Sequence, residues 1–181
     1  GVAYPIGFIF IVIGRSVLFT EHTTLAILPV LNKQAGFREL LEHWLVVYSG
    51  NILGGTLFAF GLVFLGSNMG IIDSSTFYYI AKKLTNYGHT TIFVSALFAG
   101  WLMGLLSWLL TAARETISRI QLTILVTSLI GIAGLHHSIV GSIEVIAGLI
   151  SSPELGLADY GKFQLFTTLG NIVGGVAFVG V

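Results

Sequence analysis

The sequence predicts an all-α integral membrane protein, built as an inverted repeat with two broken transmembrane helices. Of its 181 residues, 55% are hydrophobic and 9% are charged, whereas a soluble domain carries about 25% charged residues. Two apolar stretches, 2–30 and 122–150, are long enough to cross a bilayer but are interrupted by polar clusters. A glycine-rich motif that begins at Gly50 returns at Gly170. Interrupted spans in matching halves of a chain are typical of transporters.

Composition excludes several function classes. Eight basic and eight acidic residues cancel, so no basic face for nucleic acid is expected. The absence of cysteine excludes disulfides and thiolate metal sites. The chain opens inside an apolar run without a basic segment, so we expect no signal peptide and a trimmed chain.

The first half, about 1–66, opens with a broken span. An apolar run over 1–14 is followed by polar residues and then by a short apolar segment over 25–31. After a polar turn, residues 40–65 are apolar for more than the 20 or so residues that a spanning helix needs. We therefore expect two half-helices followed by one complete span.

A polar connection precedes the second half, about 89–181. Within it, 76–84 is expected to form an interfacial helix with tyrosines at the membrane boundary. An uninterrupted apolar run predicts a span at 91–112. A second broken span follows, and a last span starts near Phe163. The broken span comprises 120–134 and 139–150.

The motif Gly50-Asn51-Ile52-Leu53-Gly54-Gly55 returns as Gly170-Asn171-Ile172-Val173-Gly174-Gly175. Each copy lies in the span after a broken one, and an odd number of spans separates the copies, which inverts their orientation. We expect both glycine faces to pack inside the protomer. The repeat also implies a helix before the first broken span, which this sequence lacks.

The first break contains Leu18-Phe19-Thr20, flanked by Arg15, Glu21 and His22. Non-helical backbone persists at membrane depth only where protein buries it or a cavity adjoins it. One interpretation is a re-entrant loop that offers donors to an anion. The other is an Arg15–Glu21 ion pair that shapes the loop, since buried ions are usually paired.

The second break contains His136-His137-Ser138. Adjacent helical residues point about 100° apart, so one histidine is expected to face a pore and the other to anchor the break. Histidine titrates near neutral pH, which suits a proton relay. Alternatively, two neutral histidines satisfy carbonyls freed at the break. A metal site joined by His22 and Glu21 is a further alternative.

These motifs together resemble the formate/nitrite transporter family: Leu18-Phe19-Thr20, Trp44 to Asn51, His137-Ser138-Ile139 and Gly170 to Gly175. The resemblance covers nearly the whole chain, 1–181, as one channel domain from the second family helix to the sixth. It implies an aquaporin-like fold, a pentamer with one pore per protomer, and passage of small monovalent anions such as formate and nitrite. It implies neither enzyme activity nor a cofactor or bound metal.

By position, the resemblance assigns His137 to the central pore histidine and Thr20 to the loop threonine that contacts it. It assigns further pore positions beside the loop and at constrictions: Leu18, Phe19, Phe8, Tyr4 and Ile130. Residues left with a structural role in the breaks are Arg15, Glu21, His22, His136 and Ser138. His136 replaces the family's acid, and Leu84 falls at the vestibule lysine, with Lys82 and Lys83 close by.

We therefore interpret the chain as a channel for small anions or their weak acids, with His137 assisting protonation. It would lie in the bilayer of a bacterial or archaeal cytoplasmic (inner) membrane, as a homopentamer. Two alternatives stay open. One is a neutral-gas or ammonia pore. The other is an intramembrane metalloenzyme that uses the histidines of both breaks and Glu21.

Overall fold

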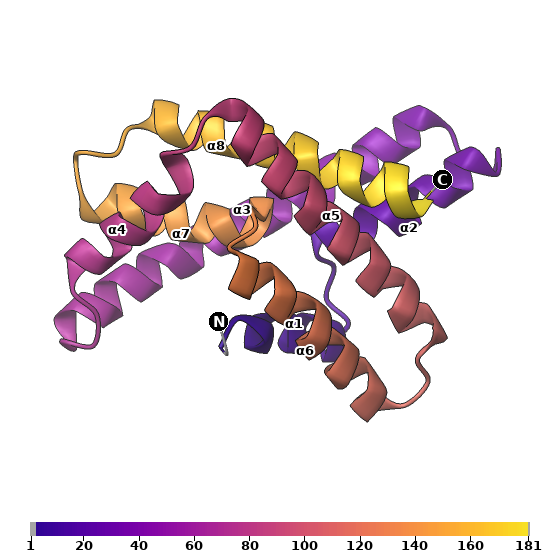
Figure 1. Ribbon diagram of the computed structural model, residues 1–181, viewed down its shortest axis with the longest axis horizontal. Coiled ribbons are helices and arrows are strands. Elements are labelled where there is room, and N and C mark those ends of the chain that lie inside the picture. The colour runs from indigo at the N-terminus through magenta and orange to yellow at the C-terminus, as the bar shows by residue number, and fades with distance from the viewer. Residues whose placement is uncertain (1–2, 181) are drawn as a thin grey trace.

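The computed structural model describes residues 3–180, and all regular structure within that range is helical (Figure 1). The elements are α1 (Tyr4–Ile13), α2 (Phe19–Leu31), α3 (Phe37–Asn68), α4 (Ser74–Thr85), α5 (His89–Ala112), α6 (Thr116–Ala133), α7 (Ser138–Ser151), α8 (Leu157–Gly175) and the π-helical turn η1 (Val176–Gly180). Gly1, Val2 and Val181, which the predicted domain includes, lie outside the described residues.

Both predicted breaks are confirmed: α1 and α2 are separate helices, and so are α6 and α7. The first break is shorter than predicted, because α2 begins at Phe19 rather than near residue 25. Its threonines fit a helix because their hydroxyls find carbonyl partners. Thr23 Oγ1 donates to the Thr20 carbonyl at 3.2 Å, and Thr24 Oγ1 donates to the Gly175 carbonyl at 2.9 Å.

The two half-helices before the breaks end in the same way. The residue after α6 is Gly134, with φ +62°, and the Leu135 N–H then donates to the Ile130 carbonyl. After α1 the left-handed residue is Arg15, with φ +54°. This conformation costs a non-glycine residue about 1–2 kcal/mol. The shared geometry agrees with the inverted repeat, and Arg15 is the strained member of the pair.

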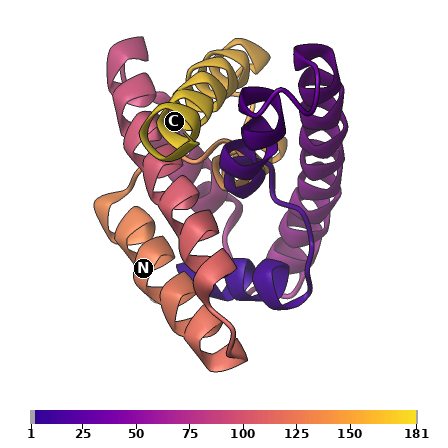
Figure 2. The ribbon, with the colours of Figure 1, turned by 90° about the vertical axis from the view of Figure 1, so that its right-hand side faces the viewer.

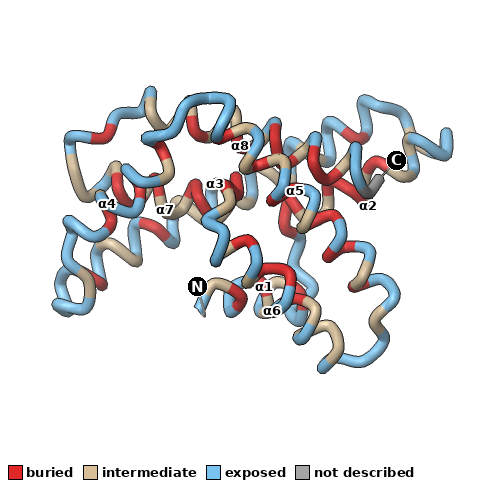
Figure 3. Tube along the Cα trace, in the orientation of Figure 1, coloured by how far each residue is buried: buried red, intermediate tan, exposed pale blue. Residues whose placement is uncertain are grey.

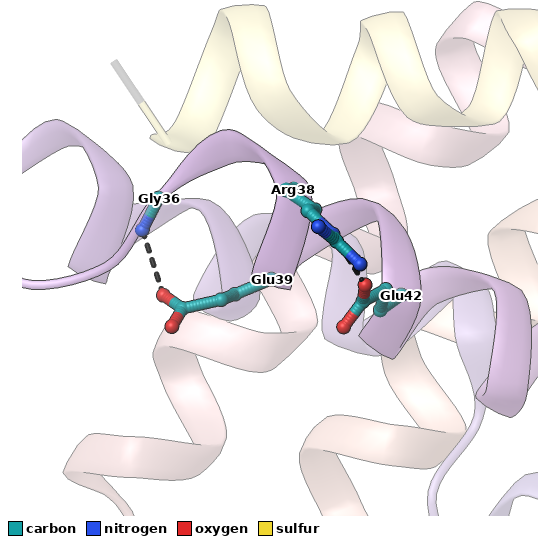
Figure 4. A network of polar contacts seen from close by, with 4 residues as sticks. All are labelled: Gly36, Arg38, Glu39 and Glu42. Atoms are coloured by element: carbon teal, nitrogen blue, oxygen red, sulfur yellow. Dashed lines mark hydrogen bonds and ion pairs between the residues drawn. The ribbon is translucent and has the colours of Figure 1, made fainter.

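The first turn of α3 explains why this helix starts before its predicted residue 40. The Glu39 carboxylate accepts a hydrogen bond from the Gly36 N–H at 2.8 Å (Figure 4). Arg38 Nε lies 2.8 Å from Glu42 Oε1, one turn further on. A carboxylate at a helix N-terminus satisfies an otherwise unpaired N–H and is favoured by the helix dipole.

Helix α4 is packed more deeply than an interfacial helix. It lies against α7, and Phe77 and Ala81 are buried there. Its tyrosines remain at the surface, where Tyr78 Oη donates to Glu154 Oε2 at 2.7 Å. The predicted helix is confirmed, but its apolar face serves the protein core.

The largest helix–helix contact joins α5 to α8 and depends on glycine. A Cβ at Gly174 would overlap the Leu97 carbonyl on α5, and a Cβ at Gly170 would lie 2.7 Å from Ala96 Cβ. The repeat-related glycines Gly50 and Gly54 are exposed, with nothing within 4 Å of such a Cβ. Among residues 3–180 the predicted packing is therefore found for the glycine face of α8, whereas no described residue covers the glycine face of α3. The reason is that α5 lies on the opposite side of the molecule from α3 (Figure 2).

Because Gly174 of α8 is tightly packed and Gly54 of α3 is not, the same glycine-to-alanine substitution is expected to change stability differently in the two helices. Gly174→Ala forces α5 and α8 apart and is expected to destabilise the fold by about 1–3 kcal/mol, as overpacking does. In a protein of residues 1–181, Gly54→Ala meets open space and is expected to change stability by less than about 0.5 kcal/mol. Thermal unfolding of the two purified variants in the same detergent measures the difference, and equal melting temperatures would refute the packing argument.

Within residues 3–180, three helices are long and apolar enough to cross a membrane: α3, α5 and α6. Two shorter apolar helices, α1 and α7, flank the breaks. Burial is concentrated in the middle of the molecule, whereas its outer ends are exposed (Figure 3). Half-helices that meet at a protein-filled midplane are the arrangement in which broken spans are tolerated.

Candidate functional site

The two breaks meet at one hydrogen bond. Thr20 Oγ1, in the first turn of α2, lies 2.7 Å from His137 Nε2, the residue before α7. Both side chains are buried, with 0% and 2% of their surfaces exposed. Residues 117 positions apart in the sequence are thus joined at the centre of the fold.

His137 also caps α7. Its Nδ1 accepts a hydrogen bond from the Val140 N–H at 3.2 Å, which satisfies a donor at the start of the helix. Because Nδ1 accepts, the proton of the neutral ring is on Nε2, which donates to Thr20 Oγ1. The Thr20 hydroxyl proton is then left to donate elsewhere. The site therefore offers the Thr20 hydroxyl as a free donor, and the imidazole N–H becomes a second donor to a solute that replaces Thr20 as its acceptor.

Asn171 holds the second break. Its Oδ1 accepts from the Ser138 N–H at 2.8 Å, and its Nδ2 donates to the carbonyls of His136 at 3.1 Å and Ala96 at 2.8 Å. The asparagine thus bonds to the backbone on both sides of His137. It is fully buried, so the orientation of the histidine backbone depends on it.

Asn51 makes the matching contacts at the first break. Its Oδ1 accepts from the Phe19 N–H at 2.8 Å, and its Nδ2 donates to the Val17 carbonyl at 3.0 Å. Leu18 therefore occupies the position in the first half that His137 occupies in the second. Sequence reasoning used the Gly-Asn motif as a sign of repetition and missed this role. The available signal was an amide side chain within an apolar span.

His136 points away from the meeting of the breaks. Its backbone N–H and its Nδ1 both contact Ser95 Oγ, at 3.1 and 2.8 Å, and its Nε2 lies 3.1 Å from the Leu84 carbonyl. The two histidines thus diverge, as their spacing predicted. They do not form a paired-histidine lumen.

A cavity of about 290 Å³ reaches His137 from one side. It is lined by three of the residues that the family resemblance assigns to the pore, namely Tyr4, Ile130 and His137. Gly131 makes room for Tyr4, since a Cβ there would lie 2.9 Å from the ring. The cavity is also lined by two charged residues that the prediction did not assign, Lys83 and Glu144. Lys83, adjacent to the predicted Leu84 position, supplies the cation of this cavity.

The remaining predicted pore residues lie in two different environments. Phe8 lies edge-on to the His137 ring, with 5.5 Å between ring centroids, and 5.4 Å from Tyr4. Leu18 is buried in the same core. Phe19 instead packs against Tyr48 and lines an apolar groove of about 530 Å³ between α3 and α8. The structure thus brings Phe8 to the histidine and directs Phe19 elsewhere.

Three arginines line a polar pocket of about 160 Å³ where α1 ends and α6 begins: Arg15, Arg114 and Arg119. Tyr4 contacts the opposite end of α6, so this pocket and the histidine cavity lie at opposite ends of the α1–α6 pair. The predicted Arg15–Glu21 ion pair is absent, since Arg38–Glu42 is the one ion pair among residues 3–180. The break is shaped by Asn51 instead.

The residues of the metal hypothesis are not assembled. Across the described chain, no group of three histidine, aspartate or glutamate side chains lies close enough to hold a metal ion. His22 Nδ1 is buried without a hydrogen-bond partner, and the Glu21 carbonyl accepts from Ser107 Oγ at 2.5 Å. Ser138 contributes its backbone N–H to Asn171, while its hydroxyl has no partner.

Comparison with known proteins gives consistent matches. The family model described as formate/nitrite transporter matches residues 1–181. The chain is 34% identical over 178 residues to the inner membrane protein YfdC of Escherichia coli K12, covering 95% of this chain and 55% of that protein. It is 25% identical to the formate channel FocA of Haemophilus influenzae, covering 100% of this chain and 71% of that one. The chain thus spans about half the length of the first of these relatives.

Solved structures with the same fold are also found. An ion channel described as of the FNT family superposes with a TM-score of 0.86 at 24% identity, covering 97% of this chain and 71% of that one. A pentameric formate channel with formate bound gives a TM-score of 0.78 at 24% identity, covering 99% and 78%. At this identity the superpositions establish the fold.

Proposed function

Because this chain belongs to the formate/nitrite transporter family, we propose that it forms a transmembrane channel for small monovalent anions or their weak acids. The main observation that supports this function is the cavity that ends at the buried, hydrogen-bonded pair of His137 and Thr20. The ligand named for one structural neighbour, formate, and the name of a relative, the nitrite transporter NirC of Salmonella typhimurium, support this substrate class.

In the proposed mechanism, charged residues at the two ends of the pore attract the anion, and residues in the middle of the pore select the solute. Lys83 on one side, and the pocket of three arginines on the other, raise the local anion concentration. Tyr4, Phe8 and Ile130 narrow the path and exclude hydrated ions. At the centre, the His137 Nε2–H and the Thr20 hydroxyl replace lost water hydrogen bonds. Moving an ion into a low-dielectric site is expensive, and protonation of the solute, assisted by His137, removes most of that cost.

We also propose that residues 1–181 form one channel domain that is completed by a further helix on α3. The repeat supports this. Gly170 and Gly174 are covered by α5, so the equivalent face at Gly50 and Gly54 would be covered by the repeat-mate of α5. Large exposed apolar side chains on α3, such as Phe58 and Phe60, are proposed to contact lipid or neighbouring protomers in a homopentamer, the assembly named for the structural neighbour.

A flux panel tests this function. The purified protein, reconstituted in proteoliposomes, is expected to conduct formate and nitrite at least tenfold faster than empty liposomes, and native mass spectrometry is expected to find five copies. Ammonia uptake is measured in the same proteoliposomes, because ammonia is the substrate of the alternative pore. Ammonia flux without formate or nitrite flux would replace the proposal with a neutral-gas pore. The divergent orientation of His136 argues against that pore.

A further inference from the structure

A carboxylate shares the cavity with the pore histidine. Glu144 lines it together with His137, and Gly141 lies between the two on the same face of α7. Seven residues along a helix correspond to about 10 Å. Among residues 3–180 no ion pair includes Glu144. The Glu144 side chain is therefore held beside the route to His137 without a salt bridge.

The groups around Glu144 define its possible roles. The titratable side chains that line the same cavity come from α1, α4, the α4–α5 connection and the break: Tyr4, Lys83, Tyr87 and His137. From α8, Tyr160 is bonded to Ser142 and lines the groove on another face. Helix α3 contributes no residue to the cavity. Among residues 3–180, Lys83 is thus the one lysine or arginine that lines this cavity.

An ionised carboxylate on an anion path repels the solute that the path is proposed to carry. Like charges repel more strongly at a partly buried site than in bulk water, because the effective dielectric constant is lower there. The repulsion disappears when Glu144 carries a proton. A protonated Glu144 also has a proton to donate, so the same residue changes from a barrier into an acid.

His137 by itself is poorly placed to be the net proton source. Its Nδ1 is occupied by the Val140 N–H, so a second ring proton has no place unless the helix cap opens. Transfer of the Nε2 proton to a solute would leave the ring without any proton. His137 is therefore suited to hydrogen-bond the solute, while the proton comes from another group.

Resting on the proposed channel function, we infer that Glu144 is the acid that protonates the solute before it reaches His137. The Glu144 carboxylic acid O–H bond breaks, and its proton forms an O–H bond with the solute carboxylate. The products are the neutral acid and the Glu144 carboxylate. Hydronium at the mouth of the cavity returns a proton to Glu144, and Lys83 holds the anion while the transfer occurs. This role assigns to Glu144 the pH dependence of entry from this side.

The test compares formate flux in proteoliposomes between pH 4 and 7.5 for the wild type and Glu144→Gln. At neutral pH the variant is expected to conduct at least tenfold less, because a positioned acid contributes such factors. Near pH 4 the solution itself supplies neutral acid, since carboxylic acids titrate there, and the two fluxes should converge. Glu144→Asp keeps a carboxyl group and should preserve most of the wild-type profile. Glu154→Gln, which alters an exposed acid outside the cavity, serves as the matched control.

Lys83→Met gives a second readout that does not depend on how Glu144→Gln folds. Removal of the cation favours the protonated carboxyl group, so the flux profile should move to higher pH, whereas Lys82→Met should leave it in place. A wild type that conducts formate, with unchanged profiles in Glu144→Gln and Lys83→Met, would overturn the role of Glu144 and leave the channel function intact. A wild type without weak-acid flux would overturn both.

Discussion

Asn171→Leu is expected to destabilise the protein by about 3 kcal/mol and to abolish conduction. The substitution keeps the side-chain volume but removes two hydrogen bonds to the backbone at the second break and a third to the Ala96 carbonyl on α5. Each buried polar group left without a partner costs about 1–3 kcal/mol. The Ser138 N–H and the His136 carbonyl flank the break, so no helical partner replaces the asparagine. Thermal unfolding in detergent, with formate flux in proteoliposomes, measures both effects.

Two other asparagines make this result interpretable. Asn51→Leu removes two bonds at the first break, where the residue is only half buried, so a smaller loss is expected. Asn68→Leu removes an exposed bond within α3 and is expected to change stability by less than about 0.5 kcal/mol. Equal melting temperatures for the three variants would show that the break does not depend on the asparagine bonds.

His137→Asn is expected to lower formate flux at neutral pH at least tenfold, with little loss of stability. Asparagine is among the best N-cap residues, so its side chain can accept from the Val140 N–H as His137 Nδ1 does. Its shorter side chain withdraws the donor that faces Thr20. Formate flux between pH 4 and 7.5 measures the loss of the hydrogen-bond donor, and the melting temperature measures the effect on the helix cap.

Two further variants complete that comparison. His137→Ala removes the cap as well and is expected to cost about 1 kcal/mol in addition. His136→Asn alters the histidine that bonds Ser95 and the Leu84 carbonyl, so a loss of stability with little change in the pH profile is expected. A wild-type flux profile in His137→Asn would reduce His137 to a structural residue at the break.

The sequence by itself determined the all-helical membrane class, the positions of both breaks and the inverted repeat. These follow from local composition and order: apolar length decides which segments cross a bilayer, and polar clusters within them mark where a helix is interrupted. Position in the family pattern also placed His137 opposite Thr20, and the structure finds the two in contact. The divergence of His136 followed from helical geometry alone.

Only the tertiary structure decided which side chains meet across the halves. These contacts join segments that lie far apart in the chain. Asn51 and Asn171 bond to the two breaks, and Phe19 packs into the α3–α8 groove. Lys83, Glu144 and His137 line one cavity. The exposed glycines of α3 and the packed glycines of α8 have the same local sequence. Their surroundings differ because packing depends on which helix lies opposite, and an amino-acid pattern within one helix does not encode its neighbour.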